Sequence, residues 1–340
     1  MSDLHQVRGF EDDWRAKVGP GRSGATPARR LQASLGLSRD RLSRLVGGAR
    51  EVMVTVTGAV HSRPQLVRHL DYISRNGTLA LEDQDGFRLS GRDTLKEMAA
   101  DWHSLTEADS LKRPDSPIGR TLVFSMPPKT DPAAFDAAVR DCAIRLWRER
   151  FEFAWVRHTD TAHPHAHLVI RAMGVGGQRF TPDRADLRTM REGFAEELRA
   201  RGVAAEATPR HLRGVTRKAE SLVVRKMREQ YERGEGPPPR TLQAAYIEAS
   251  DAAFNPSEPL RPWEVQIVRT QSHVRGLYLE EAERLAQSPD EKDQQLAKGV
   301  ESFVAQMPPA DTQRLEIARQ LRELADVLKE RAEQHRARIR

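Results

Sequence analysis

Short stretches rich in apolar residues recur along the chain, the first with an alternation of period two, and each stretch predicts a β-strand. The first begins at Glu51, where Val52, Val54 and Val56 alternate with more polar neighbours. Comparable stretches follow at 121–126, 151–157 and 166–172, with a shorter one at 178–180. Their spacing along the chain predicts that they form one sheet.

Between these stretches the apolar period becomes three to four, which predicts helices. Leu66, Leu70 and Ile73 share one face of a helix over 63–76, and the Asn76-Gly77 pair ends it. Further helices are predicted over 92–103, 135–146 and 182–201. This interleaved order predicts an α/β (α+β) fold, in which helices sandwich a largely antiparallel central sheet.

Composition divides the chain into three parts. Residues 1–48 are rich in Arg, Gly and Ser and are expected to form a basic N-terminal arm, followed by a domain over 49–233. The Gly- and Pro-rich segment 234–239 is the clearest linker. Residues 240–340 read as all-helical, and their last helix carries an apolar seam of Ile317, Leu321, Leu324 and Leu328 that could pack on its own domain or on a partner.

Charge and cysteine content narrow the class of protein. The net charge is +6 over 340 residues, and the basic excess lies in 1–50, with ten basic and five acidic residues, and in 201–250, with ten and six. Such segments either form solvated surface or bind the phosphate backbone of a nucleic acid. The single cysteine, Cys142, excludes a disulfide framework. No apolar run approaches the roughly 18 residues of a membrane helix, so we expect a soluble, cytoplasmic protein without membrane insertion.

Four of the eleven histidines fall within ten residues, at 158, 163, 165 and 167. In a strand, His165 and His167 point to the same face, and a turn before them would bring His158 alongside. Three imidazoles can bind one divalent ion and leave coordination positions open for catalysis. Asp160 is then placed to orient an imidazole or accept a proton. A structural metal site and unliganded loop histidines are the alternatives.

The ligands limit the identity of the ion to a few candidates but do not select one of them. Three imidazoles admit Mg²⁺ or Mn²⁺, the ions we expect in use, with Zn²⁺ as a further candidate, although the softness of nitrogen ligands favours Mn²⁺ and Zn²⁺ over Mg²⁺.

Tyr72 lies on the helix face turned away from the core, beside Arg68 and Arg75. Guanidinium groups bind phosphate oxygens, so a tyrosine among arginines is placed to meet a phosphodiester. A phenol attacks weakly at neutral pH, but a metal that polarises the phosphate and a base that takes the proton supply what it lacks. The alternative is a surface tyrosine that covers the core edge.

These motifs resemble those of the conjugative relaxases, or mobilisation nucleases, of the HUH-endonuclease superfamily, most closely their P class. His158, Asp160, His165 and His167 match the family pattern His-x-Asp-x4-His-x-His, and residues 65–77 resemble its first motif. The segment 191–202 is similar to the helix that follows. The resemblance covers about residues 48–215, with one departure: Arg171 stands where the family commonly has Asn.

The resemblance implies an HUH-type sheet and nicking of one DNA strand at an origin of transfer. Tyr72 would remain on the 5′ phosphate and leave a free 3′ hydroxyl, while His158, His165 and His167 bind the metal. Asp160 or His163 would assist the deprotonation of Tyr72. Expected DNA contacts are Arg68, Arg75, Arg171, Arg210 and Arg213. The implied partners are single-stranded DNA, relaxosome accessory proteins and a type IV secretion coupling protein.

Other functions fit parts of the same pattern. A rolling-circle replication initiator or a transposase would use the same chemistry. A three-histidine metallohydrolase of small substrates would need no tyrosine, and a DNA-binding regulator would use the metal only structurally. Substitution of Tyr72 by Phe separates these functions, because only a tyrosine transesterase needs the phenol.

Overall fold

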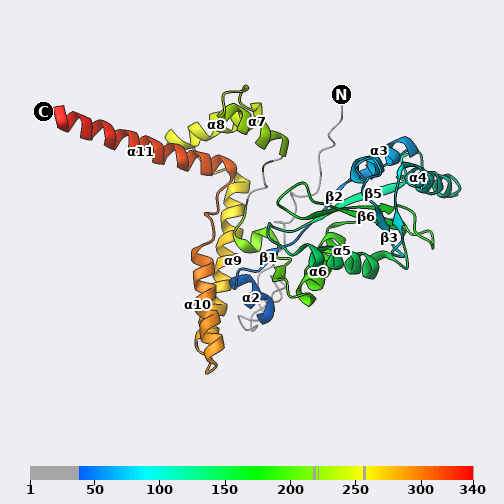
Figure 1. Cartoon of the computed structure of the whole chain (residues 1–340). Coiled ribbons are helices and arrows are strands. Elements are labelled where there is room, and N and C mark those ends of the chain that lie inside the picture. The colour runs from blue at the N-terminus through cyan, green and yellow to red at the C-terminus, as the bar shows by residue number, and fades with distance from the viewer. Residues whose placement is uncertain (1–37, 217–219, 221, 256–257, 340) are drawn as a thin grey trace. The chain divides into compact units, whose positions relative to one another are not determined.

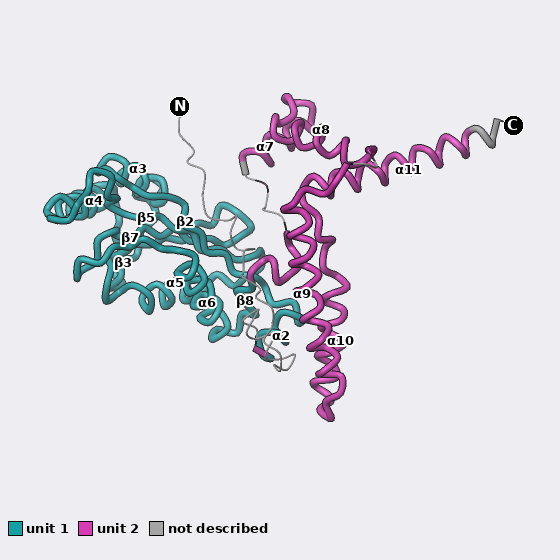
Figure 2. The backbone as a smooth tube through the Cα atoms, turned by 180° about the vertical axis from the view of Figure 1, so that it is seen from behind, with its two compact units in different colours: residues 1–9, 39–208 teal, residues 10–38, 209–340 magenta. Residues whose placement is uncertain are grey.

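The computed structural model describes residues 38–216, 220, 222–255 and 258–339. These residues form two compact units, which we call the first unit, residues 39–208, and the second unit, from residue 209 onward. Figure 1 shows the elements of the whole chain, and Figure 2 colours the two units separately. Most of the predicted N-terminal arm, 1–48, lies outside the described residues. Its last part includes α2, Arg39–Val46.

A six-stranded antiparallel sheet forms the centre of the first unit, in the order β2-β5-β7-β6-β3-β4. The strands are β2 (Met53–Val60), β3 (Leu81–Asp83), β4 (Arg88–Leu89), β5 (Gly119–Ser125), β6 (Phe153–His158) and β7 (His165–Arg171). Two further short strands, β1 (Arg50–Glu51) and β8 (Ala205–Glu206), pair in parallel.

Helices cover both faces of this sheet (Figure 1). One core joins the sheet to α3 (Arg63–Ile73) and α4 (Arg92–Glu107), and includes Leu66, Leu70 and Ile73. The other core joins it to α5 (Pro132–Trp147) and α6 (Arg184–Ala200), and includes Phe135 and Phe194. The predicted antiparallel sheet between helices is therefore confirmed.

Two local features differ from the sequence prediction. The β3–β4 hairpin was not predicted from the sequence, because strands of three and two residues are too short to show an alternating pattern. The short strand predicted at 178–180 is only an isolated bridge between Met173 and Arg179. Glycines at 174, 176 and 177 turn the chain there, and a Cβ at Gly174 would meet the carbonyl of Arg150 at 2.4 Å.

The second unit is helical among its described residues, as predicted for the C-terminal region. It consists of a 3-10 turn, η1 (Arg210–Arg213), and the helices α7 (Leu222–Glu232), α8 (Arg240–Phe254), α9 (Pro262–Ala286), α10 (Glu291–Ala305) and α11 (Gln313–Ile339). Helix α9 packs on α10, and α8 packs on α11. Within the described part of the chain, no helix is both long enough and apolar enough to cross a bilayer.

The second unit begins before the linker at 234–239. The backbone carbonyl of Leu212 accepts a hydrogen bond from Tyr278 at 3.0 Å, and that of His211 accepts one from Gln271 at 3.0 Å. These bonds join the segment after residue 208 to α9, so contacts divide the chain at 208, whereas composition divides it at 233 and 240. The limits predicted from composition, 1–48, 49–233 and 240–340, describe functional domains rather than compact units, and they stay a prediction.

The apolar seam of α11 is buried only in its first half. Ile317 is buried against α8 and Leu321 is partly buried there, whereas Leu324 and Leu328 are each 56% exposed.

Candidate functional site

Helix α3 presents Tyr72 to solvent while its opposite face is fixed in the core. The Ser62 side chain accepts a hydrogen bond from the backbone N–H of Gln65, and Pro64 lies in the first turn, so the helix start is well defined. Leu70 and Ile73 are fully buried, and Tyr72 is 56% exposed. The core therefore determines which way the phenol points.

A tight turn ends α3 directly after Tyr72. Arg75, Asn76 and Gly77 all have positive φ, at 54°, 58° and 83°. Only glycine fits the third position, because a Cβ there would meet the backbone nitrogen of Arg92 at 2.8 Å. This turn directs the Arg75 side chain back toward the sheet, where its guanidinium pairs with Asp160 and lies 3.2 Å from His158 Nδ1.

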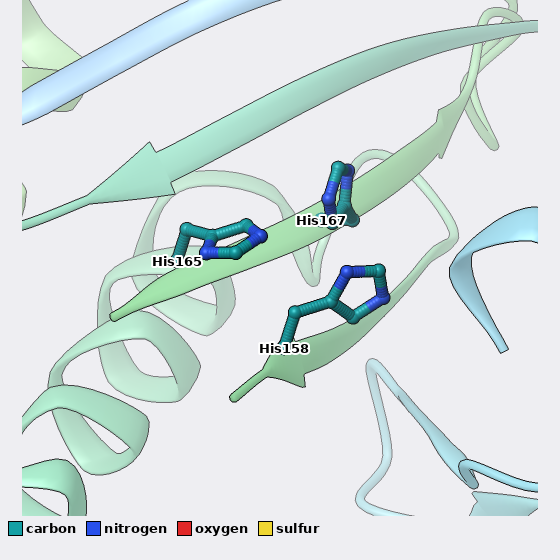
Figure 3. Close-up of side chains that lie close together, drawn as sticks. All are labelled: His158, His165 and His167. Atoms are coloured by element: carbon teal, nitrogen blue, oxygen red, sulfur yellow. The ribbon is translucent and has the colours of Figure 1, made fainter. Parts of the chain in front are cut away.

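Strands β6 and β7 bring three histidines together. In the β6–β7 register His158 lies opposite His165, and His167 lies opposite Val156, so all three side chains are on the face covered by α3. Ring centroids are 5.3 Å apart for His158 and His165, 5.4 Å for His165 and His167, and 4.4 Å for His158 and His167. Figure 3 shows the three rings gathered on one side of the two strands.

Hydrogen bonds determine which ring nitrogen of two histidines is free. His158 Nε2 lies 2.7 Å from the carbonyl of Ile73, and His165 Nδ1 lies 3.1 Å from that of His163. A carbonyl only accepts, so each of these nitrogens carries the proton. His158 Nδ1 and His165 Nε2 are left with lone pairs, which is how proteins prepare imidazoles to bind metal.

Burial favours the neutral form, which is the form that ligates metals, in two of the three histidines, His158 and His167. Burial, together with the neighbouring rings, lowers the pKa of His167 to about 3, and burial also lowers the pKa of His158. One ligand atom from each of the three histidines lies within 4.8 Å of the other two. Small rotations of the rings would bring these atoms onto one ion, so the donor set fits a divalent metal.

Tyr72 lies beside this cluster. Its ring centroid is 5.7 Å from that of His167 and 6.2 Å from that of His158, both edge-on, and the Arg75 guanidinium carbon is 5.6 Å from its centroid. The structure thus brings together the tyrosine, the three histidines and one of the five expected DNA-contact arginines. A phosphate at this point would meet a nucleophile, metal ligands and a guanidinium.

Asp160 and His163 lie in the turn between β6 and β7. Asp160 is exposed, pairs with Arg75, and has Oδ1 3.9 Å from His165 Nε2. Partial burial would raise the pKa of Asp160, but its own backbone N–H and Arg75 outweigh this effect and hold the pKa below its usual value. His163 is exposed, and the contact it makes to the cluster is through its backbone carbonyl.

The other expected DNA-contact arginines lie on different elements. Arg68 is exposed on α3, one turn before Tyr72. Arg171 is only 4% exposed and lies 3.0 Å from Glu152. Because a buried, paired guanidinium cannot reach a phosphate backbone, we remove Arg171 from the expected DNA contacts. Arg210 and Arg213 belong to η1 in the second unit, and their contact with DNA stays a prediction.

The sequence reasoning missed His69. It precedes Tyr72 by three residues on α3, its Nε2 is buried, and that atom has no hydrogen-bond partner among the described residues. Burial lowers the pKa of His69 to about 4, and the His69 ring contributes to the low pKa of His167. The signal was its i, i+3 spacing to Tyr72, which puts both on neighbouring turns of one helix side.

Comparison with known proteins agrees with this geometry. Residues 72–203 match the family model described as Relaxase: MobA/VirD2-like, nuclease domain, and this stretch lies within the first unit. The chain is 25% identical over 227 residues to the T-DNA border endonuclease VirD2 of Rhizobium radiobacter, and 26% identical over 225 residues to that of Agrobacterium fabrum (strain C58).

These alignments each cover 61% of this chain and 50% and 48% of the two relatives, so the chain spans about half the length of the curated relatives it matches. Among solved structures, a chain from "Molecular Basis of Vancomycin Resistance Transfer in Staphylococcus aureus" is matched over 47% of this chain and 98% of its own length. Its identity is 13% and its TM-score 0.31, too low to bear on the argument.

The family match and the three-histidine cluster agree with the resemblance read from the sequence. The chain therefore carries a stretch, residues 72–203, that matches the MobA/VirD2-like relaxase nuclease domain.

Proposed function

We propose that this protein nicks one strand of DNA at an origin of transfer, with Tyr72 as the nucleophile. The observation that carries the proposal is the position of Tyr72, exposed on α3 with its ring 5.7 Å from that of His167. A tyrosine that merely covered the core would have no reason to lie against the rings of His158 and His167. The relatives named as border endonucleases support a DNA substrate.

The proposed reaction is a transesterification. Tyr72 Oη loses its proton and forms a bond to phosphorus, and the bond from phosphorus to the 3′ oxygen breaks. The 5′ phosphate stays on Tyr72, and the 3′ oxygen takes up a proton to become a hydroxyl. One phosphate ester replaces another, so little bond energy is lost and the strand can be rejoined by the reverse attack. Hydrolysis by water would not allow this.

His158, His165 and His167 would hold the divalent ion, which supplies a positive charge that polarises a phosphate oxygen. The lowered pKa values of His158 and His167 and the two fixed tautomers are the features that support this role. We keep Mg²⁺ or Mn²⁺ as the ion in use and Zn²⁺ as the alternative, since three nitrogen ligands admit all three.

Arg75 and Arg68 would bind the phosphate backbone beside Tyr72. Arg75 is held in place by Asp160, and a carboxylate whose pKa lies below its usual value is a weak base. We therefore assign Asp160 to the orientation of Arg75 and His165, and leave the deprotonation of Tyr72 to His163 or to water. His163 lies in the exposed turn between β6 and β7.

The proposed biological role is the start of conjugative transfer or mobilisation of a plasmid or integrative element. The family of the nuclease domain supports it. The partners would be single-stranded DNA at the origin, relaxosome accessory proteins and a type IV secretion coupling protein. The protein would act in the cytoplasm, where that DNA lies.

A nicking assay on supercoiled DNA that carries the cognate origin tests the proposal. We expect wild-type protein with Mn²⁺ to relax the DNA, and Tyr72→Phe to abolish relaxation. Tyr246→Phe is the matched control, because Tyr246 is also exposed, at 45%, but lies on α8 of the second unit. Relaxation that persists in Tyr72→Phe would show that another nucleophile acts.

A further inference from the structure

A cavity of about 180 Å³ opens at the sheet edge where β3 leaves β6. Strand β3 pairs with β6 only at Glu82 and Asp83, so the backbone before Leu81 separates from β6. Trp155 of β6 and the α5 residues Asp136 and Arg140 line the space that results. The proposed nicking mechanism does not use this cavity.

Its size fits one flat ring system. A single water occupies about 30 Å³ in the liquid, and pockets for drug-sized ligands begin at about 300 Å³. The cavity therefore exceeds what a few bound waters need, and is too small for a folded ligand of several rings. One unpaired nucleic-acid base is of the right scale.

The lining offers both donors and acceptors. Arg140 forms a two-bond pair with Glu82, and Arg157 Nε lies 2.7 Å from Asp136 Oδ1. Arg88 of β4 is exposed and has no ion pair among the described residues. Its register partner Glu82 faces the same side of the sheet, so the free guanidinium stands beside the acceptors.

Two groups in the lining, one of them buried and the other half-buried, lack a complete set of partners. Trp155 is 5% exposed, and its indole N–H has no hydrogen-bond partner among the described residues. The Arg140 guanidinium carbon lies 5.6 Å from the Trp155 ring centroid. Burial raises the pKa of Asp136 even though Arg157 opposes the shift, so this carboxyl would gain from a further donor. An unpaired buried donor is costly, and a ligand acceptor would satisfy it.

The cavity lies next to the histidine cluster along β6. Val156 is part of its lining and stands directly opposite His167 in the β6–β7 register. Trp155 precedes His158 by three residues, about 10 Å along a strand. Arg157 and Trp155 face α5, and His158 faces α3, so the end of β6 separates the two sites. A DNA strand that crosses this end could place a phosphate at Tyr72 and a nearby base in the cavity.

We propose that this cavity binds one unpaired base of the DNA strand within a few nucleotides of the nick, and that it prefers guanine. This inference rests on the proposed function. Guanine presents the O6 and N7 acceptors that arginine recognises and an N2 amino donor for a carboxylate, whereas the other bases lack this combination. Reading single strands through splayed bases in pockets is a general mode of nucleic-acid recognition.

Selection from a single-stranded DNA library with a randomised segment tests the inference. The full chain with Tyr72→Phe is used, so that bound DNA stays intact, and the bound strands are sequenced. We expect about tenfold enrichment of guanine at one position. Adding Arg88→Ala removes that enrichment and leaves the preferences at other positions. Arg148→Ala is the matched control, since Arg148 is also exposed but pairs with Asp85 outside the cavity lining.

Three results would overturn the inference: no guanine position, a guanine position that Arg88→Ala leaves unchanged, or a uniform loss of binding that marks Arg88 as a phosphate contact. Covalent capture of the selected strand by protein with intact Tyr72 is scored separately. Capture without an Arg88 effect means that the cavity assignment is wrong and nicking stands. A guanine preference that depends on Arg88, without covalent capture, means that the cavity assignment stands and the nicking assignment is wrong.

Discussion

Replacement of Arg75 by Gln is expected to tighten metal binding and to weaken DNA binding. Arg75 Nη2 lies 3.2 Å from His158 Nδ1, and His158 Nε2 is engaged by the carbonyl of Ile73. Nδ1 is therefore the atom that His158 can offer to an ion, and it is the atom that the guanidinium faces. The cation on Arg75 and the bound ion thus compete at one lone pair.

The distances give the size of the effect. An ion about 2.1 Å from Nδ1 would lie on the lone pair that the guanidinium faces, so Arg75 has to move aside, to roughly 5 Å from the ion. The Arg75 side chain is 39% exposed, so the dielectric constant of water applies, and charges of one and two at about 5 Å repel by roughly 2 kcal/mol. Asp160 offsets part of this repulsion in the wild type. We expect the Kd for Mn²⁺ to fall about tenfold in Arg75→Gln.

Competition with a chromophoric chelator at about 0.1 M salt measures this Kd, because higher salt would screen the effect. Arg68→Gln is the matched control: it removes an exposed arginine from the same helix and should leave the Kd unchanged. Arg75→Lys keeps the charge and should stay near the wild-type value. Equal or weaker Mn²⁺ binding by Arg75→Gln would refute the reasoning.

Three further predictions concern stability and reactivity. The pKa of His69 is about 4 in the folded chain and about 6.5 in an unfolded one, so the unfolded state binds more protons between these pH values and the free energy of unfolding rises with pH. His69 should contribute about 2 kcal/mol to this rise between pH 5 and pH 7. In urea unfolding, the His69→Gln variant should show a rise that is smaller by that amount. Glu264 is buried with Arg314 Nε at 3.0 Å, so Glu264→Gln should lower the free energy of unfolding of the second unit by about 3 kcal/mol; an unchanged urea midpoint would contradict a structural role for the pair. Burial raises the pKa of Cys142 to about 12, so a thiol reagent at pH 8 should label this cysteine only after unfolding, and prompt labelling of the folded protein would show that the core around it opens.

The histidine cluster and the outward-facing position of Tyr72 on its helix could be predicted because both depend on local periodicity. The period of two in a strand puts His165 and His167 on one face, and helical spacing puts Tyr72 opposite Leu66 and Leu70. The remaining step, that the tyrosine-bearing helix covers the same sheet face as the histidines, came from the family resemblance. No periodicity specifies which face of a sheet a helix covers.

What could not be predicted depends on contacts distant in sequence. The partner that buries Arg171 is Glu152 on the neighbouring chain segment, and a sequence does not show that pairing. The cavity at β3 exists because a hairpin of very short strands pairs with β6 for only two residues. The start of the second unit at residue 209 depends on contacts such as the hydrogen bond from Tyr278 to the backbone carbonyl of Leu212, which lies 66 residues away in sequence.

The central claim is that the phenol of Tyr72 becomes covalently attached to DNA. Its most direct test is to incubate the wild-type chain with Mn²⁺ and a single-stranded oligonucleotide that carries its origin, digest the adduct with protease, and map the modified peptide by mass spectrometry. The account predicts a single 5′-phosphotyrosyl linkage at Tyr72 and a released strand with a 3′ hydroxyl. A linkage to any other residue, or cleavage that leaves no covalent adduct, would contradict it.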